Sequence, residues 1–148
     1  MNTVGERLRR LAPALWAGVL LSVALIATPA PFAVLALHDA GRVASRMLAQ
    51  EAWLSLALAM LLLFAERRRA REAAAAGRGS VLSAEMLLLL GTLACTVAGW
   101  FGVQPLMPAA RAGQGSLSFG QLHLASTVLY GIKTLLVLAL AWRASARD

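Results

Sequence analysis

The segment "QLHLASTVLYGIKTLL", residues 121–136, places polar side chains capable of chemistry inside an otherwise apolar run. At the angular spacing of a helix, these polar residues share an arc of about 120°, and the leucines, valine and isoleucine occupy the rest. An imidazole, hydroxyls and an ammonium group together can bind an ion or a small polar solute, or carry a proton. The segment therefore predicts a polar core, formed by His123, Ser126, Tyr130 and Lys133.

Lys133 is the most expensive of these residues to bury, because a lysine at the centre of a membrane helix costs roughly 2.5–3.5 kcal/mol. An acidic partner is therefore expected. Glu51 approaches from the same side and is the expected counter-charge, at the outer end of the polar core. Glu85 enters from the other end, where arginines are closer, so we expect it to pair with them.

The surrounding elements follow from composition, since 59% of the 148 residues are hydrophobic and only 14% are charged. The apolar residues fall into four blocks, each long enough to cross about 30 Å of hydrocarbon as a helix. These patterns predict an all-α integral membrane bundle, with residues 1–148 forming a single domain of four transmembrane helices. The expected spans are about 11–28, 47–65, 81–103 and 122–142, and residues 39–50 are expected to be a polar-faced lead-in at the outer interface.

The charge distribution predicts the orientation. Ten arginines lie before the first block, in the second connection or after the last block, and three lie in the other connections. By the positive-inside tendency, both termini are cytoplasmic. The preference for arginine over lysine, with abundant Ala and Leu, suggests a bacterial inner-membrane protein. Lipid head groups are the expected partners of Arg67, Arg68, Arg69 and Arg71. Nucleic acid is not expected, because these arginines do not gather on one folded face.

Small residues recur at helical spacing in two of the blocks. Such residues let the backbones of membrane helices approach closely. The expected packing positions are Gly18 in the first block and Gly91, Gly99 and Gly102 in the third.

The helix ends also carry sequence signals. Asp39 is a candidate N-cap for the second helix, and Ser118 with Gln121 forms a candidate capping box for the fourth. The prolines of "TPAP", residues 28–31, are expected to end or kink the first helix. The N-terminus also resembles a signal peptide, but Pro31 would follow the most plausible cleavage site, so an uncleaved helix is favoured.

Short motifs in the chain resemble a known family. They are Pro31 with Phe32, then Ala40 with Gly41, and the spaced set Phe119, Leu122, His123 and Ser126. Together with four spans, they resemble a bacterial four-helix family of unknown function related to a eukaryotic TMEM-type transmembrane protein. The resemblance implies an inner-membrane protein without an established reaction, and Lys133 is not part of its pattern.

Three functions remain open from the sequence. No nucleotide-binding loop, nucleophile–base arrangement or complete set of metal ligands is present in the sequence, so an enzyme is not expected. The first hypothesis is binding or movement of a small solute, ion or proton through the polar core. The second is assembly, as a homo-oligomer or as the partner of another membrane protein. The third uses His38, a possible outer-side ligand, and His123 as axial ligands of a haem.

Overall fold

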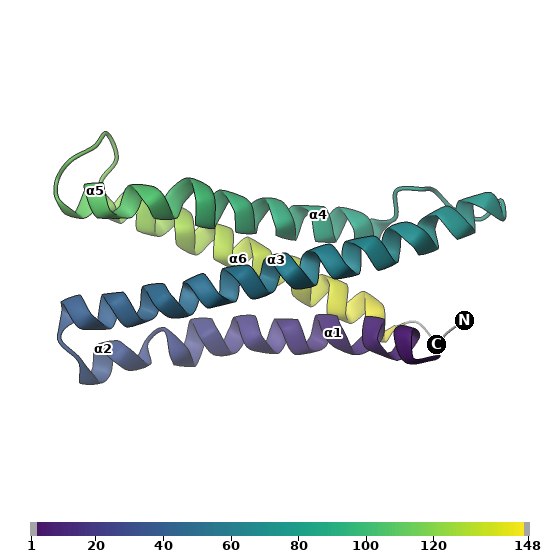
Figure 1. Cartoon of the computed structure of the whole chain (residues 1–148), viewed down its shortest axis with the longest axis horizontal. Helices are drawn as coiled ribbons and strands as arrows, with labels where there is room; N and C mark the ends of the chain where they lie inside the picture. The colour runs from purple at the N-terminus through teal and green to yellow at the C-terminus, as the bar shows by residue number, and fades with distance from the viewer. Residues whose placement is uncertain (1–2, 147–148) are drawn as a thin grey trace.

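A computed structural model describes residues 3–146, and all of their regular structure is helical (Figure 1). Four continuous helical stretches are long and apolar enough to cross a membrane: Gly5–Val34, Leu37–Ala75, Ala84–Arg111 and Phe119–Ser145. The protein is therefore a multi-pass membrane protein. The elements are α1 (Thr3–Ser22), η1 (Val23–Ala27), α2 (Ala30–Val34), α3 (Leu37–Ala75), α4 (Ala84–Val97), η2 (Ala98–Val103), η3 (Gln104–Leu106), α5 (Met107–Arg111) and α6 (Phe119–Ser145).

Helix α6 occupies the central position in the bundle. It packs against both α1 and α4, and α3 packs against α4. In Figure 1, α6 runs diagonally, from the end near α5 to the end near the N-terminus of α1. Because α6 crosses the bundle diagonally, it lies beside α1 at one end and moves away from the α1–η1–α2 segment at the other. At the α5 end, α6 is therefore separated from α2 (Figure 1).

The buried core lies in the half of the bundle that holds the N-terminal part of α1. Exposed leucines surround it, including Leu15 and Leu25, as expected where lipid replaces water around the bundle. The buried core residues are Trp16, Ala17, Leu20, Ala59, Leu89, Val137 and Leu140.

Helix α3 differs from the expected lead-in and span. It is one continuous helix of 39 residues, about 58 Å long, with no break near residue 50. No proline lies within it, so nothing ends the helix between the expected lead-in and the span. Asp39 is not the N-cap, because α3 begins at Leu37. The capping box of α6 is confirmed, with Ser118 and Gln121 bonding reciprocally at 2.9 and 3.2 Å.

Two segments, η1 and η2, are π-helical, and no feature of the sequence predicted them. In η1 the helix leaves the α pattern just before Pro29, and Thr28 N donates to Val23 O at 2.9 Å. Single π turns in otherwise α-helical segments frequently mark functional sites. Both segments border cavities in this structure, as described below.

Gly91 of α4 lies in close contact with a side chain of α6. A Cβ atom at Gly91 would lie 3.0 Å from Leu136 Cδ1. At Gly99 the nearest atom, Leu129 Cδ1, would lie 4.0 Å away, which is ordinary contact. Of the two positions, Gly91 is the one where an added side chain would require the Leu136 side chain of α6 to shift.

Gly18 and Gly102 do not pack inside the bundle, so the expectation for these two residues was wrong. Both are exposed, and no described atom of a neighbouring helix would lie within 4 Å of an added Cβ. Gly18 is exposed because the other face of α1, which carries Trp16 and Leu20, is the one buried in the core. The large apolar side chains determine which side of α1 faces the core, and Ala14, Gly18 and Ser22 face outward.

We predict that Gly91→Leu destabilises the bundle by about 1–3 kcal/mol, because the larger side chain overpacks the contact with Leu136. Thermal unfolding in mild detergent measures the effect. Gly18→Leu is the matched control and should leave the midpoint nearly unchanged. Adding Leu136→Ala to Gly91→Leu should restore part of the loss. An unchanged midpoint for Gly91→Leu would show that this contact is absent.

Candidate functional site

A buried ion pair joins α3 to α6. Lys133 Nζ donates to Glu51 Oε1 at 2.8 Å and to Glu51 Oε2 at 2.7 Å. Lys133 and Glu51 are 4% and 5% exposed, so bulk water does not screen the pair. The structure thus provides Lys133 with the counter-charge expected from the sequence, and both carboxylate oxygens are used.

The depth of Glu51 differs from the expectation. We expected Glu51 near the outer interface, above Lys133, but it lies level with Lys133 near the middle of α6. The reason is the length of α3, which begins at Leu37, about 21 Å of helix before Glu51. The contact is therefore direct, and no bridging water or hydroxyl is needed.

The pair extends to α1 through two further donors. Ser55 Oγ donates to Glu51 Oε1. Trp16 Nε1 donates to Ser55 Oγ at 2.9 Å, so α1, α3 and α6 are joined by one chain of hydrogen bonds. Removing one member of such a buried pair leaves an uncompensated charge, which is strongly destabilising.

Tyr130 forms a second link between α6 and α1. Its hydroxyl donates to Leu20 O at 2.9 Å. Lys133 Nζ lies 4.5 Å from the centre of the Tyr130 ring, a favourable cation–π distance. The ring is thus held between the ion pair and the backbone of α1, in a defined position.

A large cavity of about 1270 Å³ lies between α3, α6 and the α1–η1–α2 segment. His123, Ser126 and Tyr130 line it from α6, and His38 lines it from α3. The structure therefore brings three residues of the expected polar core, and His38, to one cavity. Lys133 does not line this cavity.

A second, smaller cavity of about 40 Å³ lies beside the ion pair. Lys133 and Glu51 line it, together with Ser126 and Tyr130, which also line the large cavity. Its volume is enough for a water molecule, which needs roughly 10–15 Å³. The polar face of α6 therefore connects the large cavity to the ion pair.

The two π-helical segments border these cavities. Ala24 of η1 lines the large cavity, while Gly99 and Trp100 of η2 line the small one. Thr28, at the end of η1, also lines the large cavity, and its buried Oγ1 has no hydrogen-bond partner among the described residues. An unpartnered buried hydroxyl is uncommon, and here it lies where a ligand could supply the partner.

The end of the large cavity near α5 holds an arginine. Arg111, at the end of α5, places its guanidinium 4.8 Å from the centre of the Phe119 ring. The same group lies beside Gly41 of α3, where a Cβ would be 3.9 Å from both terminal nitrogens. Phe119 also stacks on His123, with ring centres 5.8 Å apart. Arg111, Phe119 and His123 thus form one continuous layer at this end.

The opposite face of α6 is exposed, in agreement with the helical pattern. Leu124 and Val128 on this face are 64% and 50% exposed, whereas Leu135, which is 67% exposed, lies at the rim of the large cavity. The hydroxyls of Thr127 and Thr134 donate to backbone oxygens one turn earlier in α6. These two threonines therefore satisfy their donors within α6.

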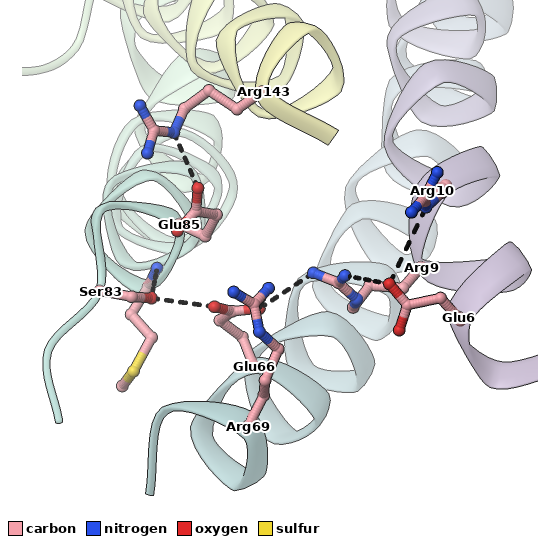
Figure 2. A network of polar contacts seen from close by, with 9 residues as sticks. Glu6, Arg9, Arg10, Glu66, Arg69, Ser83, Glu85 and Arg143 are labelled. Atoms are coloured by element: carbon pink, nitrogen blue, oxygen red, sulfur yellow. Dashed lines mark hydrogen bonds and ion pairs between the residues drawn. The ribbon is translucent and has the colours of Figure 1, made fainter. Parts of the chain in front are cut away.

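A buried carboxylate, Glu66, organises the other end of the bundle and was not recognised in the sequence (Figure 2). Ser83 Oγ donates to Glu66 Oε1 at 3.1 Å and also accepts from Met86 N at the start of α4. Arg9 of α1 lies 3.5 Å from Glu66, and Arg69 lies 3.9 Å from it. Glu66 therefore links α1, α3 and α4.

A second ion pair at this end joins α4 to α6, because Arg143 Nε donates to Glu85 Oε1 at 2.8 Å (Figure 2). Glu85 thus pairs with an arginine, as expected. Among the expected lipid-contacting arginines, Arg67, Arg68 and Arg71 are exposed, whereas Arg69 is half-buried and points toward Glu66. Lipid contact by the three exposed arginines remains a prediction. Arg147 lies outside the described residues.

We predict that Lys133→Met costs about 3–5 kcal/mol of unfolding free energy, because it leaves the Glu51 carboxylate buried without its counter-charge. Unfolding in mixed micelles measures the loss. The double variant Glu51→Gln with Lys133→Met removes both charges and should regain most of the stability. If the single and double variants unfold alike, the two side chains are not coupled.

Most of the amino-acid sequence matches one known protein family. Residues 11–116 match the family described as a domain of unknown function (DUF4149). No curated protein and no solved structure matches the chain. The matched region contains Glu51, His38 and Arg111, whereas the polar residues of α6 follow it. Because the match covers well over half of the chain, the protein belongs to the DUF4149 family.

Proposed function

We propose that this protein is a membrane protein that binds a small molecule in the large cavity between α1, α3 and α6. The observation that carries the proposal is the lining of that cavity, whose volume is about 1270 Å³. Ligand pockets typically enclose roughly 300–1,000 Å³, mostly apolar with a few placed polar groups. Here Leu21, Phe32 and Leu138 supply apolar surface, and His123 and Tyr130 supply polar groups.

The packing of the bundle interior supports binding rather than passage through the bundle. Trp16, Leu89 and Val137 are at most 2% exposed and close the interior of the bundle beyond the ion pair. A solute in the large cavity would therefore meet a packed core. Tyr130, held by Lys133 and by the backbone of α1, is the group best positioned to contact it from below.

The location and orientation are part of the same proposal. We infer a bacterial inner-membrane protein from the preference for arginine over lysine with abundant Ala and Leu, and cytoplasmic termini from the arginine distribution. The N-terminal end of α1 and the C-terminal end of α6 lie at the same end of the bundle, which is consistent with both being on one side of the membrane (Figure 1). The proposed kinship to TMEM-type proteins rests on the sequence resemblance alone. A reporter active only outside the membrane should stay silent at either terminus, and strong activity at both would contradict the orientation.

Haem binding is the second candidate, because one observation favours it. His38 of α3 and His123 of α6 line the same cavity from different helices. Among the described residues, no group of three or more His, Cys, Asp or Glu side chains could hold a metal ion. Two imidazoles are nevertheless sufficient as axial ligands of a haem. Absorbance of the purified protein near the haem band separates this candidate from the first.

We predict that Gly131→Trp abolishes ligand retention, because Gly131 lines the cavity and has open space beside it. Native mass spectrometry after purification in mild detergent should detect a bound small molecule on the wild type and none on this variant. Gly18→Trp, on the exposed side of α1 and outside the cavity lining, is the matched control and should retain the molecule.

A bound molecule on Gly131→Trp as abundant as on the wild type would contradict the proposed site. Circular dichroism confirms that the variant is folded. Assembly, the remaining alternative, predicts a different outcome: an oligomeric mass in detergent and no bound small molecule.

A further inference from the structure

We propose that the large cavity takes an anionic phospholipid of the surrounding bilayer, with its phosphate at Arg111 and an acyl chain along α6 toward Leu138. This inference rests on the proposed function, since it names the class of molecule that the cavity binds. Three features of the cavity carry it: a side opening at the depth of the hydrocarbon, a long lining that is mostly apolar on α1, η1, α2 and α3, and positive charge at one end.

The side opening follows from two leucines at the rim. Leu135 and Leu138 both line the cavity and are 67% and 38% exposed. Both follow Lys133 in α6, inside a stretch apolar enough to cross a membrane. Surface that is exposed at this depth faces lipid rather than water. The cavity therefore opens sideways into the bilayer, where phospholipid is the available solute.

The cavity is long enough for an acyl chain, and its apolar surface comes mainly from other helices, with Leu21, Ala24, Phe32 and Leu48 among the lining residues. From His123 to Leu138, α6 rises about 22 Å. One leaflet of hydrocarbon is about 15 Å thick, half of the roughly 30 Å core. The volume of about 1270 Å³ also exceeds the roughly 300–1,000 Å³ that drug-sized ligands occupy. A whole acyl chain and its glycerol end can thus lie in the cavity.

The charge is at the outer end, where a head group would lie. Among the described residues, Arg111 has no ion pair, and its guanidinium lies over the Phe119 ring and close to Gly41. An arginine fork binds phosphate through two parallel hydrogen bonds. The nearby carboxylate, Asp39, lies 3.9 Å from Arg42 and so has its own counter-charge.

Further donors lie along the path between head group and chain. His38 and His123 line the cavity and carry ring N–H groups. Thr28 Oγ1 is buried without a partner, and the ester carbonyl of a phospholipid would accept from it. The donors of this end therefore match the oxygens of a phosphate and an ester.

Lipid exchange tests the assignment. The full-length protein is equilibrated with equal amounts of phosphatidylglycerol and phosphatidylcholine of the same chain length, and retained lipid is measured by native mass spectrometry. We expect the wild type to prefer phosphatidylglycerol by about fivefold, the effect of roughly one arginine near an anionic lipid. Arg111→Gln should remove this preference. Arg46→Gln, an exposed outer arginine outside the cavity lining, should keep it.

Two cavity-filling variants separate the possible failures. Gly131→Trp fills the cavity from α6, and Ala24→Phe fills it from η1. If one variant fails to fold, the other still tests whether the filled cavity loses its lipid. Loss of lipid in these variants, together with an Arg111-dependent preference, supports the proposal. Equal retention of the two lipids, no effect of Arg111→Gln, or retention of a free fatty acid in place of phospholipid would overturn it while the proposed binding function stands. Unchanged retention of every lipid in both filled variants would overturn both.

Discussion

The ion pair between Glu51 and Lys133 is the interaction on which the arrangement of the bundle depends. Two opposite charges buried near the middle of a membrane protein must meet, because either one alone is strongly unfavourable there. Their contact at 2.7–2.8 Å fixes the depth and rotation of α6 relative to α3. Ser55 and Trp16 then transmit this constraint to α1. A single pair thus sets the positions of three of the four long helices.

The cavity follows from this arrangement. With α6 held at its middle by α3 and crossing toward α1 at one end, the other end of α6 lies apart from α1 and α2 (Figure 1). At the end of the bundle that holds the N-terminus of α1, the helix ends are joined by polar contacts. Glu66 accepts a hydrogen bond from Ser83, and Glu85 accepts one from Arg143 (Figure 2). At the opposite end, near α5, no comparable network is present among the described residues. The large cavity lies there, and its side chains are suited to a ligand. Packing at one end and a cavity at the other are consequences of the same diagonal helix.

Much of the fold could be predicted from the sequence. The four apolar blocks correspond to the four long helices, because length and hydropathy alone determine which segments cross a membrane. The polar face of α6 was also readable, since its residues recur at helical spacing. The capping box at Ser118 is confirmed for the same local reason: its partners are three residues apart.

The parts that could not be predicted depend on contacts between helices. Gly18 belongs to a small-residue stripe, yet the large side chain of Trp16 decides which face of α1 is buried. The depth of Glu51 depends on where α3 begins, and a helix without an internal proline gives no signal for a boundary. Glu66 lies among arginines in the sequence, and only the fold shows that Arg9 and Ser83 reach it from α1 and the start of α4.

The most direct test of the ion pair uses the fact that Lys133 is the only lysine in the chain. Protein labelled with ¹⁵N at the lysine Nζ and with ¹³C at the glutamate carboxyl is reconstituted in lipid bilayers, and the ¹⁵N–¹³C dipolar coupling is measured by solid-state NMR. The structure predicts one strong coupling, consistent with both Nζ–Oε contacts, that disappears in Glu51→Gln. A lysine signal without carboxyl coupling in the wild type, or a coupling that survives Glu51→Gln, would contradict the account.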